Sequence, residues 1–268
     1  MTVRIGIAGI AGRMGRLLAA ETLRQPGAKL SAASVRKGSA GDGADIGRIL
    51  GGEPLGVIAT HDTRALFGHS DVVIDFTTAS AAPAHAALAA ELGKALVLGS
   101  SGLSPAQESE VARAAEKAPI VYAANFAPGA NLLFALVERM AEVFGPEAYD
   151  IEIFETHHRQ KIDSPSGTAI ALGRAAAKGR GVDFEAVKQS GRDGHHGPRE
   201  TGAIGFAALR GGQVVGEHEV RFLGASEHVT LGHRSFDRAV YAQGAVRAAQ
   251  WAAGRPAGLY GMKDVLGL

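Results

Sequence analysis

The chain contains no cysteine, and this absence sets the first limit on its chemistry. Disulfide bonds, thiolate catalysis and cysteine-ligated metal centres are excluded, so any redox chemistry must come from a bound cofactor. The chain also lacks a large excess of either positive or negative charge, because it has 28 Lys and Arg residues and 27 Asp and Glu residues, a formal net charge of +1. No global field therefore favours nucleic acid or an anionic membrane surface, and any cationic site must be local.

Long apolar runs are also absent. No stretch of about 18 apolar residues occurs, and the N-terminus enters a strand pattern without a charged and then apolar leader. We therefore expect a cytoplasmic protein with no membrane partner. The chain has 268 residues, 46% of them hydrophobic, which is enough for a substantial core and two domains.

The first motif is a strand, a glycine-rich turn and a helix. Residues 3–8 are typical of a buried strand, Gly9, Gly12 and Gly15 follow, and a helix is expected through about Arg24. A dinucleotide pyrophosphate needs this context, because glycines allow close backbone approach and a helix N-terminus favours the anion. The G-x-x-G-x-x-G spacing is not the usual one, and a plain tight turn is the alternative.

The end of the second expected strand, residues 30–35, bears on the choice of dinucleotide. An acidic residue there would accept hydrogen bonds from the ribose 2′-hydroxyl, but the chain has Val35, Arg36 and Lys37. With Arg13 these cations could surround a 2′-phosphate, which favours NADPH over NADH. The alternative is that Arg36 and Lys37 are solvated loop charges.

Strands and helices alternate through the first half of the chain. Buried strands are predicted at 72–76, 95–99 and 120–124, with helices at about 80–92 and 105–117, which indicates a Rossmann-like, doubly wound parallel sheet. Ligands of such sheets bind beyond the carboxyl ends of the strands, so residues 76–78, 99–102 and 124–126 are expected to line the nicotinamide side. Capping and turn formation would also explain their Thr, Ser and Asn residues.

The pattern changes after residue 127. A long helix to about residue 144 is followed by strands at 149–154 and near 202–209, 214–222 and 226–234, with a hairpin turn at Arg210–Gln213. We expect an α+β domain with an open mixed sheet, helices on one face and a free face for another subunit. The expected domains are 1–127 plus 238–268, for the dinucleotide, and 128–237, for substrate and oligomerisation.

The densest group of proton-transferring and anion-binding residues lies in residues 155–168, between a strand and a helix. Pro165 stands where the helix can begin, and Ser164 or Ser166 can cap it. We expect the backbone N–H groups of Ser166, Gly167 and Thr168 to be unpaired and to point outward, as carboxylate binding requires. Lys161 adds a mobile positive charge, so the segment suits a small acidic substrate.

Two histidine pairs occur in this half. His157 and His158 lie at a strand end and should point to opposite sides, so one can face the chemistry and the other a carboxylate. His195 and His196 lie in a glycine-rich segment without a third ligand at a recognised spacing. We therefore expect no metal site.

Four segments together carry a resemblance to a known family. They are the glycine turn Gly9–Gly15, the segment Ala123–Phe126, the string ETHHRQKIDSPSGTA at residues 155–169, and the ending MKDVL at residues 262–266. Over essentially its full length the chain resembles the 4-hydroxy-tetrahydrodipicolinate reductase family, and the histidine-containing string is the most specific part. The resemblance implies a bacterial enzyme of the diaminopimelate route to lysine that uses NAD(P)H.

The resemblance also implies roles for individual residues. His157 corresponds to the acid/base residue and Lys161 to the proton donor, although the sequence leaves their division of labour open. The implied substrate contacts are His158, Lys161, Ser166, Gly167 and Thr168. The implied cofactor contacts are Gly9, Ile10, Ala11, Gly12, Arg13, Met14, Gly99, Ser100, Ser101, Ala123, Ala124, Asn125 and Phe126, to which the charge argument adds Arg36.

The chain departs from the family pattern at two places. Relatives that use NADH well carry an acid at the position of Val35, and threonines are common where Ser100 and Ser101 stand. Relatives are usually homotetramers joined through the sheet of the second domain, which we expect here. Two rival interpretations remain: a nicotinamide oxidoreductase acting on another small acid, and a non-catalytic NADP(H) sensor.

Overall fold

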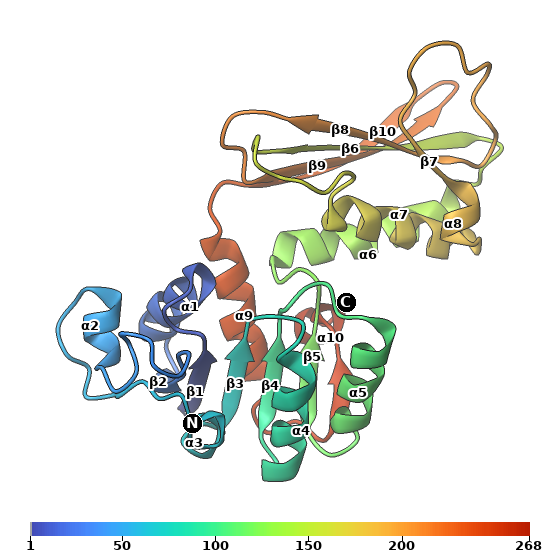
Figure 1. Cartoon of the computed structure of the whole chain (residues 1–268). Coiled ribbons are helices and arrows are strands. Elements are labelled where there is room, and N and C mark those ends of the chain that lie inside the picture. The colour runs from blue at the N-terminus through green and yellow to red at the C-terminus, as the bar shows by residue number, and fades with distance from the viewer. Residues whose placement is uncertain (1) are drawn as a thin grey trace. The chain divides into compact units, whose positions relative to one another are not determined.

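The computed structural model describes residues 2–268, which divide into two compact units (Figure 1). The first unit contains the chain up to Pro128 together with Ala239–Gly267, and the second contains Gly129–Arg238. The chain therefore leaves the first unit once and returns to it. Among the described residues no helix combines the length and the apolar character that crossing a bilayer requires.

The first unit is built on a parallel sheet. Its strand order within the described residues is β11-β5-β4-β3-β1-β2, and every neighbouring pair is parallel, which confirms the prediction of a doubly wound sheet. The three-residue strand β11 was not foreseen. The strands are β1 (Val3–Ala8), β2 (Ala28–Ala33), β3 (Val72–Asp75), β4 (Ala95–Leu98), β5 (Pro119–Tyr122) and β11 (Gly258–Tyr260).

Helices cover both faces of this sheet. The core on one face contains residues of α1, α9 and α10, and the core on the other contains residues of α3, α4 and α5. Strands buried on both sides need apolar residues on both faces, which is why β4 and the first three residues of β3, before the buried Asp75, form apolar runs. The helices are α1 (Arg13–Arg24), α2 (Ile46–Leu50), α3 (Thr63–Gly68), α4 (Ala82–Leu92), α5 (Pro105–Ala115), α9 (Ala239–Ala252) and α10 (Met262–Leu266).

The second unit contains a mixed sheet, as predicted, in the order β10-β9-β6-β8-β7. The predicted hairpin at Arg210–Gln213 is wrong, because β6 lies between β8 and β9, parallel to the first and antiparallel to the second. The antiparallel neighbours β9 and β10 follow each other in the chain instead. The strands are β6 (Tyr149–His157), β7 (Lys188–Ser190), β8 (Ile204–Arg210), β9 (Gly216–Gly224) and β10 (His228–Ser235).

Three helices lie along one face of this sheet (Figure 1): α6 (Pro128–Val143), α7 (Gly167–Arg180) and α8 (Phe184–Val187). Side chains alternate along β6, so Ile151 and Ile153 are buried in the core with these helices, whereas Phe154 and Thr156 belong to the opposite, open face. The same alternation places Glu155 and His157 on the helix side, at the carboxyl end of the strand.

Candidate active site

Glu155 and His157 form a buried pair at the end of β6. Glu155 is 2% exposed, and its Oε2 lies 2.6 Å from Nδ1 of His157. The sequence predicted that one histidine of the His157–His158 pair would face the chemistry and the other a carboxylate; in the structure it is His157 that contacts the carboxylate of Glu155. The strand therefore presents an imidazole whose orientation is set by a carboxylate two residues earlier.

Arg210 completes the surroundings of Glu155. Its two terminal nitrogens donate to the two carboxylate oxygens, each over 2.7 Å, and the Ser166 N–H donates to Oε1 over 3.0 Å. Burial alone would raise the pKa of Glu155, but the hydrogen bonds from His157, Arg210 and Ser166 outweigh it and lower the pKa to about 2. Glu155 is thus a stable anion in the interior.

The hydrogen bonds of residues 211–214 show why the segment after Arg210 does not form a hairpin turn. The Gly211 N–H donates to the carbonyl of His157 over 2.9 Å, and the His158 N–H donates to the carbonyl of Val214 over 2.8 Å. Residues 211–214 thus pass across the carboxyl end of β6 before β9 begins. Arg210 also donates to the carbonyl of Asp163 over 2.7 Å, which fixes the loop that follows the two histidines.

The start of α7 lies beside the pair. Ser166 is the N-cap, and its Oγ accepts the Ala169 N–H over 3.2 Å, so of the two serines proposed as caps Ser166 is correct. The expectation of an unpaired Ser166 N–H is wrong, because Glu155 accepts it. Gly167 is exposed, and a Cβ added there would meet nothing within 4 Å. Space for a ligand therefore remains at the first residue of the helix.

His218 was not foreseen as part of this site. From β9 its Nε2 lies 3.0 Å from Ser166 Oγ, and its ring meets that of His157 edge-on with centroids 5.1 Å apart. Burial first, and then the nearby His157, lower the pKa of His218 to about 3. His218 is therefore neutral at ordinary pH.

Lys161 and His158 occupy the rim of the site. Lys161 Nζ lies 2.9 and 2.8 Å from the two carboxylate oxygens of Asp163, and its side chain is 20% exposed. The Nδ1 of His158 is buried without a hydrogen-bond partner in the described part of the chain. A cation, histidine donors and the helix start together can hold a small anion and transfer a proton to it.

The glycine turn in the first unit has the shape that a dinucleotide pyrophosphate needs. Gly9 has a φ of +72°, and a Cβ on Gly15 would lie 2.2 Å from the Gly9 carbonyl oxygen. The N-cap of α1 is Gly12, which has no side chain that could cap the helix, and both Gly12 and Arg13 are exposed. The residues present thus fit an anion at an open helix start.

Other predicted cofactor contacts lie near this turn or at neighbouring strand ends. The Ile10 N–H donates to the Ser34 carbonyl over 3.0 Å, which ties the turn to the segment preceding the exposed Arg36. Ser100, after β4, is buried with its Oγ unpartnered among the described residues. Phe126 is only 1% exposed and lies in the core, so its side chain packs rather than facing solvent.

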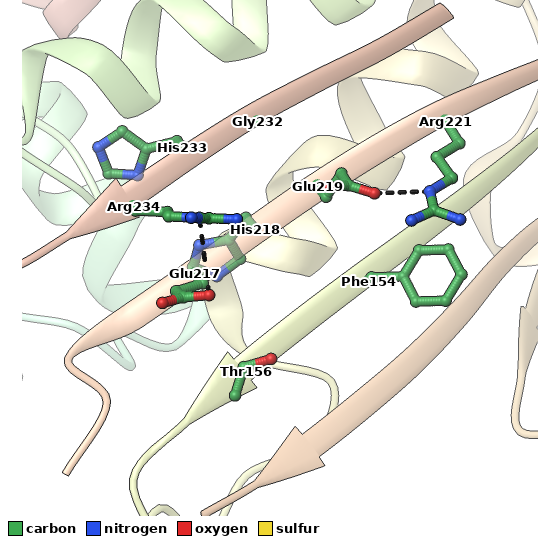
Figure 2. Close-up of a pocket in the computed structure, with 9 residues that line it drawn as sticks. All are labelled: Phe154, Thr156, Glu217, His218, Glu219, Arg221, Gly232, His233 and Arg234. Atoms are coloured by element: carbon green, nitrogen blue, oxygen red, sulfur yellow. Dashed lines mark hydrogen bonds and ion pairs between the residues drawn. The ribbon is translucent and has the colours of Figure 1, made fainter. Parts of the chain in front are cut away.

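The open face of the second sheet carries a shallow pocket (Figure 2). Arg221 lies over the ring of Phe154, 4.7 Å from its centroid, and is paired with Glu219. Across the strands Arg234 faces Glu217 at 3.8 Å. Each of these two arginines thus has a glutamate partner.

Within residues 2–268 no group of three or more His, Cys, Asp or Glu is placed to hold a metal ion.

Comparison with known families agrees with this geometry. The family model described as dihydrodipicolinate reductase, N-terminus, matches residues 3–126, and the one described as dihydrodipicolinate reductase, C-terminus, matches residues 129–266. The chain belongs to the dihydrodipicolinate reductase family. The boundary between the two matches falls at the point where the chain first passes between the two units.

Individual relatives extend the family match over the whole chain. Proteins named 4-hydroxy-tetrahydrodipicolinate reductase from Granulibacter bethesdensis and Acidiphilium cryptum are 54% and 53% identical, over 100% and 99% of this chain and 98% of each relative. A solved structure described as dipicolinate-bound dihydrodipicolinate reductase from Paenisporosarcina sp. TG-14 matches with a TM-score of 0.79 at 26% identity, covering 99% of this chain and 100% of its own. An amine dehydrogenase from Mycobacterium smegmatis, at 14% identity and a TM-score of 0.61, shares the fold alone.

Proposed function

We propose that this chain is a 4-hydroxy-tetrahydrodipicolinate reductase, which uses NAD(P)H to reduce the cyclic imine formed when that substrate loses water, giving tetrahydrodipicolinate for diaminopimelate and lysine synthesis. The observation that carries the proposal is the grouping of His157 and the start of α7 around the buried carboxylate of Glu155, with Lys161, paired with Asp163, in the loop between them. The names of the relatives over the full chain length support it.

Substrate binding falls to the second unit. The substrate is a dicarboxylate, and the start of α7 at Gly167 and Thr168, with the ammonium group of Lys161, provides the positive potential that a carboxylate requires. Lys161 is held by Asp163 in the structure, so the proposal requires Lys161 to exchange that partner for the substrate. His158 and Ser166 complete the proposed substrate contacts.

Proton transfer falls to His157 and Lys161. The chemistry that a reduced nicotinamide would supply, when bound, is a hydride for a ring carbon of the substrate. Electron density then builds on the neighbouring enamine carbon, and a positioned acid must protonate that carbon. Because Nδ1 of His157 is engaged with Glu155, Nε2 is the ring atom available for this transfer.

Cofactor binding falls to the first unit. Gly9, Gly12 and Arg13, at the start of α1, would hold the pyrophosphate, and the strand-end residues Gly99–Ser101 and Ala123–Phe126 would hold the nicotinamide half. We propose a preference for NADPH, because Val35 provides no acid for a ribose 2′-hydroxyl while Arg36 and Arg13 offer charge for a 2′-phosphate.

We also propose a homotetramer joined through the open face of the second sheet. Leu209 is 62% exposed on this face, opposite Thr156 in the register of β6 and β8. A large exposed apolar side chain on the same face as Phe154 is suited to burial against another subunit. The pocket of Figure 2 and the edge strand β10 belong to the same face.

The activity is tested by following NADPH consumption with freshly generated 4-hydroxy-tetrahydrodipicolinate and, in parallel, with simple keto acids. Turnover of the first substrate alone supports the proposal. Turnover of keto acids alone would identify a different nicotinamide oxidoreductase, and NADPH binding without any turnover would favour a sensor.

A further inference from the structure

We propose that Glu155 is a positioning residue, which holds His157 as the Nδ1–H tautomer and joins this histidine to the start of α7. The inference rests on the proposed function, because it concerns the group assigned there to proton transfer. Glu155 itself does not need to contact the substrate. Its effect is exerted through the orientation of the imidazole and through the position of the helix.

The tautomer follows from the chemistry of the two side chains. An ionised carboxylate can only accept hydrogen bonds, so the hydrogen in the 2.6 Å contact between Glu155 Oε2 and His157 Nδ1 must belong to Nδ1. Nε2 of the neutral ring then carries the lone pair, and this atom takes up and releases the proton. The opposite tautomer would place two acceptors face to face.

The structure keeps Glu155 ionised by satisfying both of its oxygens. Oε1 accepts from Arg210 and from the Ser166 N–H, and Oε2 accepts from Arg210 and from His157. Four donors thus meet a buried carboxylate from β6, β8 and the α7 cap. Removing any one of these donors would leave the buried carboxylate of Glu155 with an unsatisfied oxygen lone pair, which costs free energy.

A purely structural role does not account for this arrangement. A buried ion pair is generally no more stabilising than well-packed apolar residues of the same volume, because desolvation offsets the attraction between the charges. The adjacent inward positions of β6, Ile151 and Ile153, are in fact apolar. The ionic group occurs only where the strand reaches His157 and the open start of α7.

Several other charged or titratable groups surround His157 and enter any account of its pH behaviour. Arg210 approaches from β8 and His218 from β9, while His158, Lys161 and Asp163 belong to the segment that follows β6. In the described residues none of these five groups is hydrogen-bonded to the His157 ring, whose partner is Glu155. Substituting Glu155 therefore changes the immediate partner of the imidazole and leaves these neighbours in place.

The first test needs no catalysis and no variant of Glu155. Nitrogen-15 NMR of the full-length protein labelled at histidine, with His157→Gln to assign the signal, reports which ring nitrogen carries the proton. We expect the neutral His157 ring to be protonated at Nδ1 and bare at Nε2. A neutral ring protonated at Nε2 would overturn the proposal, whether or not the protein reduces the proposed substrate.

The second test compares two glutamates of β6. Glu155→Gln removes the charge beside His157, and Glu152→Gln removes the charge of a carboxylate on the opposite face that is bound by Arg192 and Arg199. We expect Glu155→Gln to lower kcat about 10²–10⁴-fold, with substrate KM changed less than about threefold, and to move the kcat–pH profile to lower pH. Glu152→Gln, with its mass in solution verified, should retain the wild-type profile.

The outcomes separate the two proposals. A wild-type protein that does not reduce the substrate refutes the proposed function, and the NMR result still decides the tautomer. Equal effects of Glu155→Gln and Glu152→Gln, or a kcat loss in Glu155→Gln without any change in the pH profile, would refute the positioning role. If Glu155→Gln does not fold, the NMR measurement on the wild-type protein still decides the tautomer and so still tests the proposal.

Discussion

The Nε2 of His218 lies 3.0 Å from the Oγ of Ser166, so a histidine of β9 is hydrogen-bonded to the residue that caps α7. The same Oγ accepts the Ala169 N–H. His218 is 6% exposed, and its Nδ1 has no partner in the described residues. The cap of the proposed substrate-binding helix thus depends on a histidine that must remain neutral.

We predict that acid destabilises the protein in two overlapping windows. The pKa of His218 falls from 6.5 to about 3 on folding, so the unfolded chain binds more protons between these values and stability decreases as pH falls through them. The pKa of Glu155 falls from 4.5 to about 2, so its contribution is lost as pH falls through that range. Each group contributes a slope of up to about 1.4 kcal/mol per pH unit inside its window.

Urea unfolding of wild type and His218→Gln between pH 7 and pH 4 tests the histidine window. The glutamine retains a hydrogen-bonding group but does not titrate, so the variant should show a flatter dependence of the free energy of unfolding between pH 6.5 and pH 4.5. Identical slopes for the two proteins would contradict the assignment. His233, whose pKa is also lowered by burial, is unchanged in both and serves as a common background.

His157→Gln and Lys161→Met should each lower kcat about 10²–10⁴-fold if the residue supplies the proton, with smaller changes in cofactor affinity. The physical reason is that the chemical step then lacks a positioned acid. Steady-state kinetics with the dipicolinate precursor measure the effect. His195→Gln, at an exposed position of the loop before β8, is the matched control, and near-normal turnover in both test variants would refute the site.

Gly167→Ala should fold normally but bind substrate poorly. A Cβ at Gly167 meets nothing within 4 Å, so we expect Tm to change by no more than about 2 °C, while the methyl group narrows the space at the helix start and raises substrate KM about tenfold. Gly15→Ala is the contrasting variant. Its Cβ would lie 2.2 Å from a backbone oxygen, which should destabilise the protein by about 1–3 kcal/mol. Wild-type KM in Gly167→Ala would contradict the proposed substrate position.

Arg36→Ala should weaken the use of NADPH more than that of NADH. Loss of one charge-assisted contact to a 2′-phosphate corresponds to about 1.5–3 kcal/mol, or roughly 10–100-fold in kcat/KM for NADPH. Arg113→Ala, an exposed arginine on α5 of the same unit, controls for the change in net charge. An equal effect on both cofactors would show that Arg36 is a solvated loop charge.

Leu209→Glu should reduce the mass of the protein in solution. A carboxylate on the open sheet face would be buried without a partner if another subunit covers this face, at a cost of several kcal/mol. Sedimentation velocity measures the result, and Leu259→Glu, an exposed leucine of β11 in the first unit, is the control. A monomeric wild type, or a tetramer insensitive to Leu209→Glu, would refute the proposed interface.

Most of the fold was predictable from the sequence, because buried strands must be apolar and because alternating strands and helices allow few sheet topologies. Strand β4 is apolar throughout and β3 is apolar up to the buried Asp75 at its carboxyl end, a pattern that only a sheet covered on both faces requires. The short strands β7 and β11 were missed, since three residues carry no periodicity. The strand neighbours of β6 were misjudged, because Gly211 and Gly212 predict a tight turn equally well for a hairpin and for a segment that crosses a third strand.

The candidate site was predictable only where its residues are close in sequence. His157, Lys161 and Ser166 lie within ten positions of one another, and their spacing was informative. Arg210 and His218 reach the same place through strand pairing, with Arg210 opposite His157 in the register of β6 and β8. Nothing local to Arg210 marks it as the partner of a buried carboxylate, and the correct strand order was needed to find it.

The interrupted first unit has a consequence for synthesis of the protein. Its core includes Ala242, Val246 and Ala249 of α9 together with Met262 and Val265 of α10, all made after the second unit is complete. On a translating ribosome the central segment, which is contiguous in sequence, can therefore finish folding first. The glycine turn is among the earliest parts to emerge, yet the α9 and α10 part of the core behind its sheet is made last, so nascent chains halted near residue 238 should lack a complete core in the first unit.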